Sequence, residues 1–523
     1  MTGVTIMAKK SINYMDYTQG LDCKIDHMLS YDEVRSLIME KNVYAAAAEL
    51  SPNEMLLDDH LREMKKRCIN SKTNYCINML TDEKMRSSEL YRFCKKLPKG
   101  SDLHVHGLAP LPVRELIQFL RMRDDVEICT EDGDDKYVLF MSDDDERPMG
   151  CMKLEKALQK KLMTEDELIR KWSVLSADEN GNIWDHFENL FRCHQVLGQD
   201  MKLLEDYYEA AFRYYRMQNI IHIEVRHLFF GTNEEAADTA RAIRSAYYKV
   251  RDDYPDFIAS VFGAALKHKD LQKNVAKTLI DNAMYIHENV KDEYEEDNIC
   301  NFLVGIDLVN EEDNSRPLEY YRTLIERVKL RCPEMKLTLH AGESYRLENT
   351  AVFDAYLNGA SRVGHALTLW RYPDLLERYK RKNICIEVCP ISNSALGYVR
   401  DIRFHPAAEY LKRGLNVVLG SDDPAYFEYS ALTDDFFAAV ICWDLTISEI
   451  KLLCMNSITY SSLCDDHKNF LFKRWRESWE SFISEIVPPE ELVPVKKPQF
   501  VTVKANPFNA VPAPETLDLS NEE

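Results

Sequence analysis

The sequence lacks long hydrophobic runs. No apolar stretch among its 523 residues reaches the length of about 18 that crosses a bilayer, so we expect no membrane span and no membrane partner. The first twenty residues hold no apolar segment long enough for the core of a secretory signal peptide. No asparagine stands in an N-x-S/T glycosylation triplet. These absences make the cytoplasm the expected compartment.

Positive charge is scarce as well. Lysine and arginine together number 66 against 87 aspartates and glutamates, which gives a net charge of −21. No local basic cluster offsets this excess, so the surface repels phosphate backbones and nucleic acid is not an expected partner. The fourteen cysteines are scattered, several of them within apolar runs, which is typical of buried reduced thiols.

Eight short apolar runs recur along the chain. They are nearly continuously apolar, which is typical of parallel strands covered on both faces. Stretches with helical periodicity separate most of them, which predicts an α/β fold of the (β/α)₈ TIM-barrel type over residues 98–486. The runs span residues 101–107, 220–226, 257–266, 301–308, 336–343, 362–367, 384–390 and 416–424, and the helical stretches span 189–218, 235–251, 270–290 and 316–331.

Three further parts surround the predicted barrel. Residues 1–97 are polar and helical in pattern, with Ser51 and Glu54 at the spacing of a capping box. An acidic, turn-rich stretch at about 108–175 fills the long gap after the first strand and predicts an inserted subdomain. Residues 487–523 are Pro-rich and charged, which predicts a flexible or surface extension.

Polar side chains interrupt the apolar runs where each predicted strand ends. Catalytic groups of (β/α)₈ barrels lie at these carboxyl ends, so we expect the side chains to share one pocket. An HxH pair alone is weak support, but its two imidazoles point to one face of a strand and can bind one metal. The residues are His104 and His106 after the first strand, His340 and Glu343 after the fifth, His365 after the sixth, and Asp422 and Asp423 after the eighth.

The donor types in this set suit a zinc ion. Three imidazoles and one carboxylate can bind Zn²⁺ and leave a position for water. Glu343 lies one turn beyond His340, where an acid can move protons without being a ligand. His365 could instead be a histidine of the core. Asp422 and Asp423 could instead form a helix cap and turn. Two adjacent carboxylates repel each other without a cation, however, which favours the metal.

The motifs HVH, HAGE, VGHAL, CPISN and GSDDP occur in the order found in the adenosine deaminase superfamily. The sequence resembles more closely the adenosine deaminase-related growth factors, or type-2 adenosine deaminases, in LPKGSDLHVH and MNSITYSSL. NEMLLDDHL resembles that family's helical dimerisation arm, which implies a homodimer. The arm's apolar residues also exceed what one exposed helix keeps in water, and they are Met55, Leu56, Leu57, Leu61 and Met64.

The resemblance also implies a site and a reaction. One Zn²⁺ per chain would be held by His104, His106, His340 and Asp422. His365 would orient or deprotonate the water that attacks C6 of the purine. Glu343, in its protonated form, would donate to N1. Adenosine and 2′-deoxyadenosine would thus be deaminated hydrolytically, adenosine to inosine and ammonia. Asp423 would hydrogen-bond N7 of the base.

The sequence departs from the superfamily pattern at two substrate positions. Gly107 stands where nucleoside deaminases place an aspartate that contacts the ribose, and Asn310 stands where they place a glycine near N3. AMP deaminases lack both, so AMP or another 5′-modified adenosine is the alternative substrate. Trp184 matches a tryptophan near the substrate in the resembling family, with a core anchor as its other interpretation.

Two further alternatives concern function and redox state. Another metal-dependent amidohydrolase could share the barrel, although HAGE and the paired aspartates favour a purine deaminase. A non-catalytic growth-factor-like protein is the second alternative, although the complete set of ligands and acid opposes it. Cys129 and Cys151 bracket the insert where a secreted relative would place a disulfide. In a cytosolic protein we expect free thiols there.

Overall fold

The computed structural model describes residues 48–69, 75, 79–80, 82–131, 133, 135–174, 183–295, 298–427 and 429–494. The predictions for residues 1–47 and for the tail from residue 495 lie outside the described residues. Within the described part of the chain, no helix combines the length and the apolarity that a membrane crossing requires.

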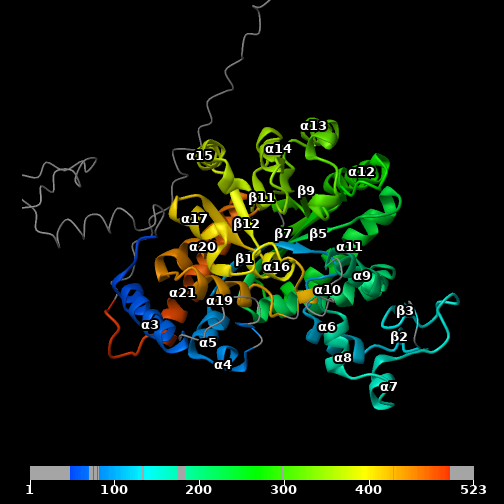
Figure 1. The fold of residues 1–523 in the computed structure, drawn as a ribbon, viewed down its shortest axis with the longest axis horizontal. Coiled ribbons are helices and arrows are strands. Elements are labelled where there is room, and N and C mark those ends of the chain that lie inside the picture. Colours follow the sequence, from blue (N-terminus) through cyan, green and yellow to red (C-terminus); the bar gives the residue numbers. More distant parts are fainter. Residues whose placement is uncertain are drawn as a thin grey trace, which may run out of the picture.

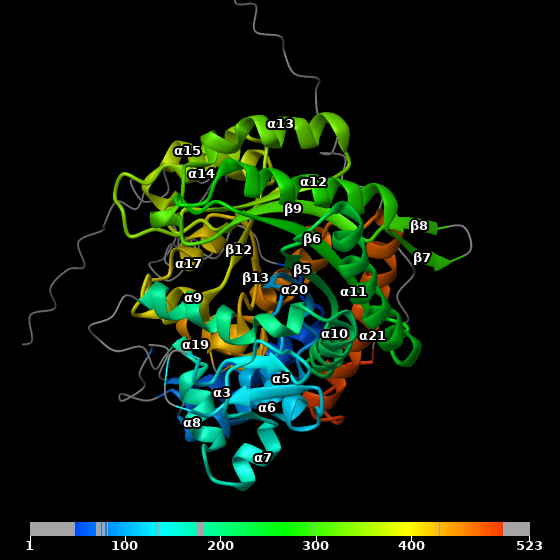
Figure 2. The same ribbon diagram turned by 90° about the vertical axis from the view of Figure 1, so that its right-hand side faces the viewer.

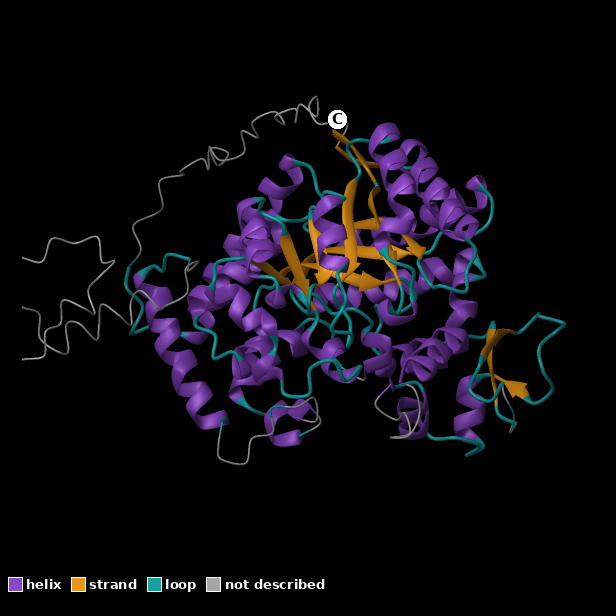
Figure 3. Ribbon diagram, turned by 45° about the horizontal axis from the view of Figure 1, so that its top comes forward, coloured by secondary structure: helices purple, strands orange, loops and turns teal. Residues whose placement is uncertain are grey.

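Eight parallel strands form a closed barrel at the centre of the molecule (Figure 3). They follow each other in chain order around the barrel, and backbone bonds between the first and the last close it: the His106 N–H donates to the Asp422 carbonyl at 3.0 Å. The predicted (β/α)₈ fold is confirmed. The strands are β1 (Gly100–His106), β5 (Ile220–His227), β6 (Ile258–Leu266), β9 (Leu303–Val309), β10 (Lys336–Ala341), β11 (Arg362–His365), β12 (Cys385–Val388) and β13 (Asn416–Leu419).

Helices cover the outside of the barrel (Figures 1 and 2). Several begin at the caps that the sequence provides: Thr232 and Glu235 form a capping box at the start of α11, for example. The stretch 189–218 divides into α9 (Ile183–His194) and α10, because Asp200 caps a new helix by accepting from the Leu203 N–H. The main outer helices are α10 (Met201–Met217), α11 (Asn233–Asp253), α12 (Lys273–Asn289), α13 (Arg322–Arg331), α14 (Ala351–Leu357), α15 (Pro373–Arg381), α17 (Pro406–Lys412) and α20 (Ile447–Thr459).

Helix α3 (Pro52–Cys68) begins at the predicted capping box of Ser51 and Glu54. It packs against α20, α5 (Glu89–Lys96) and α21 (Asp465–Ile486) of the same chain (Figure 1). This packing buries three of the five apolar side chains on which the dimer prediction partly rested, Leu57, Leu61 and Met64. That part of the argument is wrong, since the chain itself covers them. The homodimer stays a prediction.

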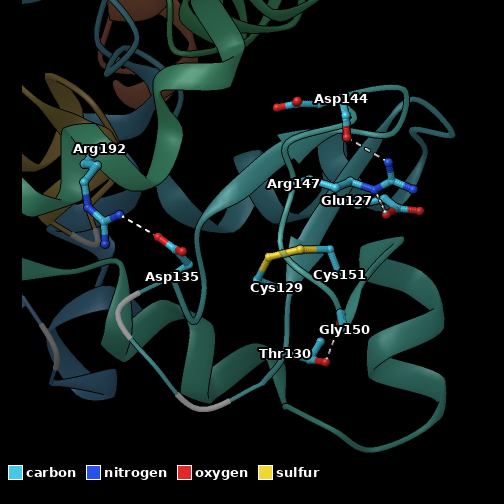
Figure 4. The surroundings of a disulfide bond; sticks show 9 residues. All are labelled: Glu127, Cys129, Thr130, Asp135, Asp144, Arg147, Gly150, Cys151 and Arg192. Atoms are coloured by element: carbon cyan, nitrogen blue, oxygen red, sulfur yellow. Dashed lines mark hydrogen bonds and ion pairs between the residues drawn. A yellow bond between two sulfur atoms is a disulfide. The ribbon is translucent and has the colours of Figure 1, made fainter.

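The chain between β1 and α9 carries a small antiparallel sheet that projects beside the barrel (Figure 1). It consists of β2 (Val126–Cys129), β3 (Leu139–Met141) and β4 (Cys151–Met152). The register of β2 and β4 places Cys129 opposite Cys151, and the two sulfurs are bonded (Figure 4). The expectation of free thiols is therefore wrong in this structure, because neighbouring strands bring the two side chains into contact. The predicted domain boundaries stay predictions.

Other cysteines behave as the sequence predicts. Nine free cysteines lie in the described residues, and seven of them are buried. Cys385 and Cys389 belong to the apolar run at β12, where burial raises the pKa of both thiols well above its usual range. These thiols are protonated packing groups rather than nucleophiles.

Candidate active site

Four side chains converge where β1, β10 and β13 end. His104 and His106 are two residues apart on β1, so both imidazoles face the inside of the barrel. The Nε2 atom of His106 lies 3.2 Å from Nε2 of His340 and 3.1 Å from Oδ1 of Asp422. The same carboxylate oxygen lies 3.4 Å from Nε2 of His104. The structure thus brings together the four predicted metal ligands.

The spacing of these atoms fits the binding of one zinc ion. With metal–ligand bonds of about 2.0–2.1 Å, two ligand atoms of the same ion lie at most about 4.2 Å apart, and the three separations above are 3.1, 3.2 and 3.4 Å. His104 Nε2 is buried and has no hydrogen-bond partner among the residues that the structure describes, which is costly unless a cation uses its lone pair. The donor set and its geometry therefore suit Zn²⁺.

Two buried carboxylates hold the imidazoles from behind. Glu387 on β12 lies 2.7 Å from Nδ1 of His104, and Asp307 on β9 lies 2.9 Å from Nδ1 of His340. Each carboxylate fixes the proton on Nδ1, so that Nε2 presents its lone pair to a metal. Sequence reasoning missed both roles. The available signal was a single acid within each of the apolar runs ICIEVCP and GIDL.

Arginines keep these carboxylates charged. Arg226 on β5 donates to Asp307 at 2.7 Å and also to Glu387, and Arg362 on β11 donates to Glu387 at 2.5 Å. Burial alone would raise the pKa of Glu387, but the guanidinium groups of Arg226 and Arg362 outweigh it and hold the pKa below its usual range. Arg226, Arg362, Asp307 and Glu387 thus form a buried group of ion pairs inside the barrel, beneath the proposed ligands.

Glu343 and His365 lie beside the ligands without belonging to the four. The His365 imidazole centroid lies 5.0 Å from that of His104, and one of its nitrogens is within 4.8 Å of the ligand atoms of His104, His340 and Asp422. Glu343 Oε1 lies 3.3 Å from Nδ1 of His365. Burial, followed by the negative charges of Asp422 and Glu312, raises the pKa of Glu343 well above its usual range. The buried carboxyl is therefore suited to carry a proton.

The backbone is strained where two of these groups are placed. His365 has φ +64° and Asp422 has φ +59°, in the left-handed region that side chains other than glycine rarely occupy. Such conformations cost of order 1–3 kcal/mol each and cluster at active sites. Here they turn the chain at the ends of β11 and β13, so that both side chains face the site.

Asp423 points to the same region and has spare bonding capacity. Its side chain is buried, and Oδ1 has no hydrogen-bond partner among the described residues. Burial, followed by repulsion from Asp422, raises the pKa of Asp423 well above its usual range. Asp423 is thus suited to form a hydrogen bond with an incoming group through Oδ1.

The family model for adenosine deaminase matches residues 184–477, more than half of the chain. The chain belongs to the adenosine deaminase family. It is also 27% identical over 469 residues to adenosine deaminase 2-A of Danio rerio, with 83% of this chain and 90% of that protein covered. These findings confirm the resemblance predicted from the motifs, and membership makes the protein a hydrolase of the deaminase type.

Solved structures share the barrel of this deaminase. The N6-methyl-AMP deaminase from Arabidopsis thaliana superposes with a TM-score of 0.55 at 16% identity, covering 75% of this chain and 99% of that chain. An amidohydrolase from Burkholderia ambifaria, solved with bound Zn, gives a TM-score of 0.54 at 16% identity, covering 85% and 98%. At such identities the likeness shows the fold alone.

The structure leaves no room at Gly107 for the aspartate that nucleoside deaminases place at this position. A Cβ atom at Gly107 would lie 2.4 Å from Nδ1 of His227 and 3.0 Å from the Tyr208 hydroxyl. A side chain at 107 would thus point toward His227, so the position offers no open space for a substituted carboxylate. Replacing Gly107 by Asp would displace His227 and is not a clean test of ribose recognition.

Trp184 lies on helix α9, and Asn310 is hydrogen-bonded to the same helix. Asn310 follows β9 with φ +113°, and its amide donates to Glu188 on α9 at 3.2 Å. The Trp184 indole N–H donates to the Tyr398 hydroxyl at 3.0 Å. Tyr398 in turn stacks on Tyr345, two residues beyond Glu343, with 4.2 Å between ring centroids. Trp184 is therefore buried in the core and also connected, through Tyr398 and Tyr345, to the loop that carries Glu343.

Proposed function

We propose that the protein is a zinc-dependent enzyme that hydrolyses adenosine and 2′-deoxyadenosine to the corresponding 6-oxopurine nucleosides and ammonia. The observation that carries the proposal is the close approach of His104, His106, His340 and Asp422 beside the buried carboxyl of Glu343, whose pKa is raised. Membership of the adenosine deaminase family supports the reaction class. We propose one zinc ion per chain.

Each residue has a role that its surroundings support. A bound zinc supplies the Lewis acidity that lowers the pKa of water at the site toward neutrality. Protonated Glu343 donates to N1 of the purine, which makes C6 more electrophilic. His365 orients or deprotonates the water that adds at C6, and the amino group leaves as ammonia. Asp423, whose pKa is raised by burial and by the charge of Asp422, hydrogen-bonds N7.

Adenosine ranks before AMP among the proposed substrates. The sequence shows no cluster of arginine or lysine residues that would bind a phosphate. The curated relative adenosine deaminase 2-A of Danio rerio matches most of the chain. AMP stays the alternative substrate, because Gly107 and Asn310 both match the pattern of AMP deaminases.

A substrate panel tests the proposal. We expect kcat/KM to be higher for adenosine and 2′-deoxyadenosine than for AMP, with 5′-methylthioadenosine turned over as well, because no carboxylate follows the HxH motif to oppose a substituent at the 5′ end. Inosine formation is followed by the ultraviolet absorbance change, with and without a chelator and with re-addition of Zn²⁺. A kcat/KM for AMP that is tenfold or more above the value for adenosine would show that the enzyme acts on nucleotides.

Two further assignments stay proposals. The homodimer rests on the resemblance of NEMLLDDHL to the dimerisation arm of relatives. We propose the cytoplasm as the compartment, which requires that Cys129 and Cys151, bonded in this structure, be reduced in the cell. Thiol alkylation after acid quench of fresh cells tests this: alkylation of both cysteines supports the cytoplasm, and their protection by a disulfide contradicts it.

A further inference from the structure

A chain of hydrogen bonds leads from the backbone of α17 to Glu343 and His365, and each of its directions can be assigned. It begins at His405, the residue that caps α17 (Pro406–Lys412). Nδ1 of His405 lies 3.1 Å from the backbone nitrogen of Ala407. A backbone N–H can only donate, so Nδ1 of His405 is the acceptor and its ring proton sits on Nε2.

The second bond joins His405 to Asn393 on α16 (Pro390–Ala395). Nε2 of His405 lies 3.1 Å from Oδ1 of Asn393. Since Nε2 carries the proton, it donates and the amide oxygen accepts. Burial lowers the pKa of His405 to about 3, so the ring is neutral and has one proton to give. The orientation of the Asn393 amide is thus fixed with its NH₂ group on the far side.

The NH₂ group of Asn393 faces both catalytic side chains. Nδ2 lies 2.7 Å from Oε1 of Glu343 and 3.1 Å from Nδ1 of His365. Its two protons serve the two acceptors. Oε1 of Glu343 lies 3.3 Å from Nδ1 of His365, farther than the Asn393 amino group. A proton on Nδ1 would meet that amino group at 3.1 Å, with two donors pointing at each other. His365 therefore accepts at Nδ1, and its own proton is on Nε2.

We propose that Asn393 and His405 are positioning residues that set the tautomer of His365. The inference rests on the proposed function and decides between the two roles left open for His365. Nδ1 faces Asn393, so Nε2 is the ring nitrogen on the other side. With its proton on Nε2, the neutral imidazole is a hydrogen-bond donor on that side and has no lone pair there to accept a proton. His365 thus orients the attacking water and does not deprotonate it. The same amide of Asn393 also fixes the position of the Glu343 carboxyl by donating to it.

Two substitutions at His405 separate this role from simple packing. The ring of His405 packs against Trp443, with 5.6 Å between centroids, and is buried. His405→Phe keeps an aromatic ring but removes the donor to Asn393. His405→Gln removes the ring but keeps a donor at similar reach. Both variants lose the cap to Ala407, so the cap cannot explain a difference between them.

The activity arm compares zinc-loaded full-length enzymes. We expect His405→Phe to lower kcat by about tenfold or more with little change in KM, because a buried acceptor loses its partner and the Asn393 amide is free to turn. We expect His405→Gln to keep most of the wild-type kcat, because it retains a donor to Asn393. The opposite order, with His405→Phe active and His405→Gln impaired, would show that the ring serves packing and would overturn the proposal.

The spectroscopic arm does not depend on turnover. ¹⁵N-histidine labelling of the zinc-loaded protein reports which nitrogen of each imidazole is protonated, and the His365→Gln variant identifies the signals of His365. We expect a proton on Nε2 and a bare Nδ1 in the wild type and in His405→Gln, and loss of this preference in His405→Phe. A proton on Nδ1 of His365 in the wild type overturns the proposal. An inactive wild type with the expected tautomer would instead refute the proposed function alone.

Discussion

At the scale of single residues, the convergence of the proposed metal ligands could be predicted, and the groups that hold their side chains could not. His104, His106, His340 and Asp422 each end an apolar run, so the barrel topology alone collects them at one edge. Glu387 and Asp307 lie within strands, and their partners come from strands that are distant in sequence. Only the closed barrel shows that both carboxylates face imidazoles. The proton position on His365 likewise depends on contacts from α16 and α17.

We expect Glu387→Gln to weaken zinc binding. The change keeps the size of the side chain but removes the charge that orients His104, and loss of such partners costs about 10–100-fold in metal affinity. Zinc affinity is measured by competition with a chelator, and circular dichroism checks that the fold persists with Arg226 and Arg362 less fully paired. Glu409→Gln, on an exposed site of α17, is the control. An unchanged zinc affinity in a folded Glu387→Gln protein would contradict the orienting role.

At the scale of elements, the eight strands were predicted to within a few residues at their starts, because parallel strands covered on both faces read as short apolar blocks. The division of 189–218 was missed, since an amphipathic pattern continues across the break at Asp200. The antiparallel sheet of β2, β3 and β4 was also missed. Its strands are two to four residues long, too short for a periodicity to show.

Helix α3 offers a matched pair of substitutions. Leu61 is 1% exposed and packs within the chain's core, whereas Met55 on the same helix is 53% exposed. We expect Leu61→Ala to lower the free energy of unfolding by about 2–5 kcal/mol, and Met55→Ala to change it by less than about 0.5 kcal/mol. Urea unfolding of the full chain measures both. A Met55→Ala cost that equals that of Leu61→Ala would show that the outer face of α3 is also buried in solution.

At the scale of the whole molecule, the oligomeric state is a separate prediction. We expect light scattering of the full-length protein to give twice the chain mass of 60.9 kDa. The full chain is required, because α3 and α5 belong to the core and their removal would expose buried apolar side chains. A mass equal to one chain across the micromolar range would contradict the homodimer and leave α3 with a purely intramolecular role.

The central claim is that four ligands hold one zinc ion while Glu343 supplies the proton. Its most direct test is the Glu343→Gln variant, assayed for zinc content and for adenosine deamination side by side with the wild type. We expect about one zinc per chain in both proteins, since Glu343 is not a ligand, and a kcat lower by about 10²–10⁴ in the variant, since general acid catalysis is lost. A variant that keeps its zinc and stays within tenfold of the wild-type kcat would contradict the account.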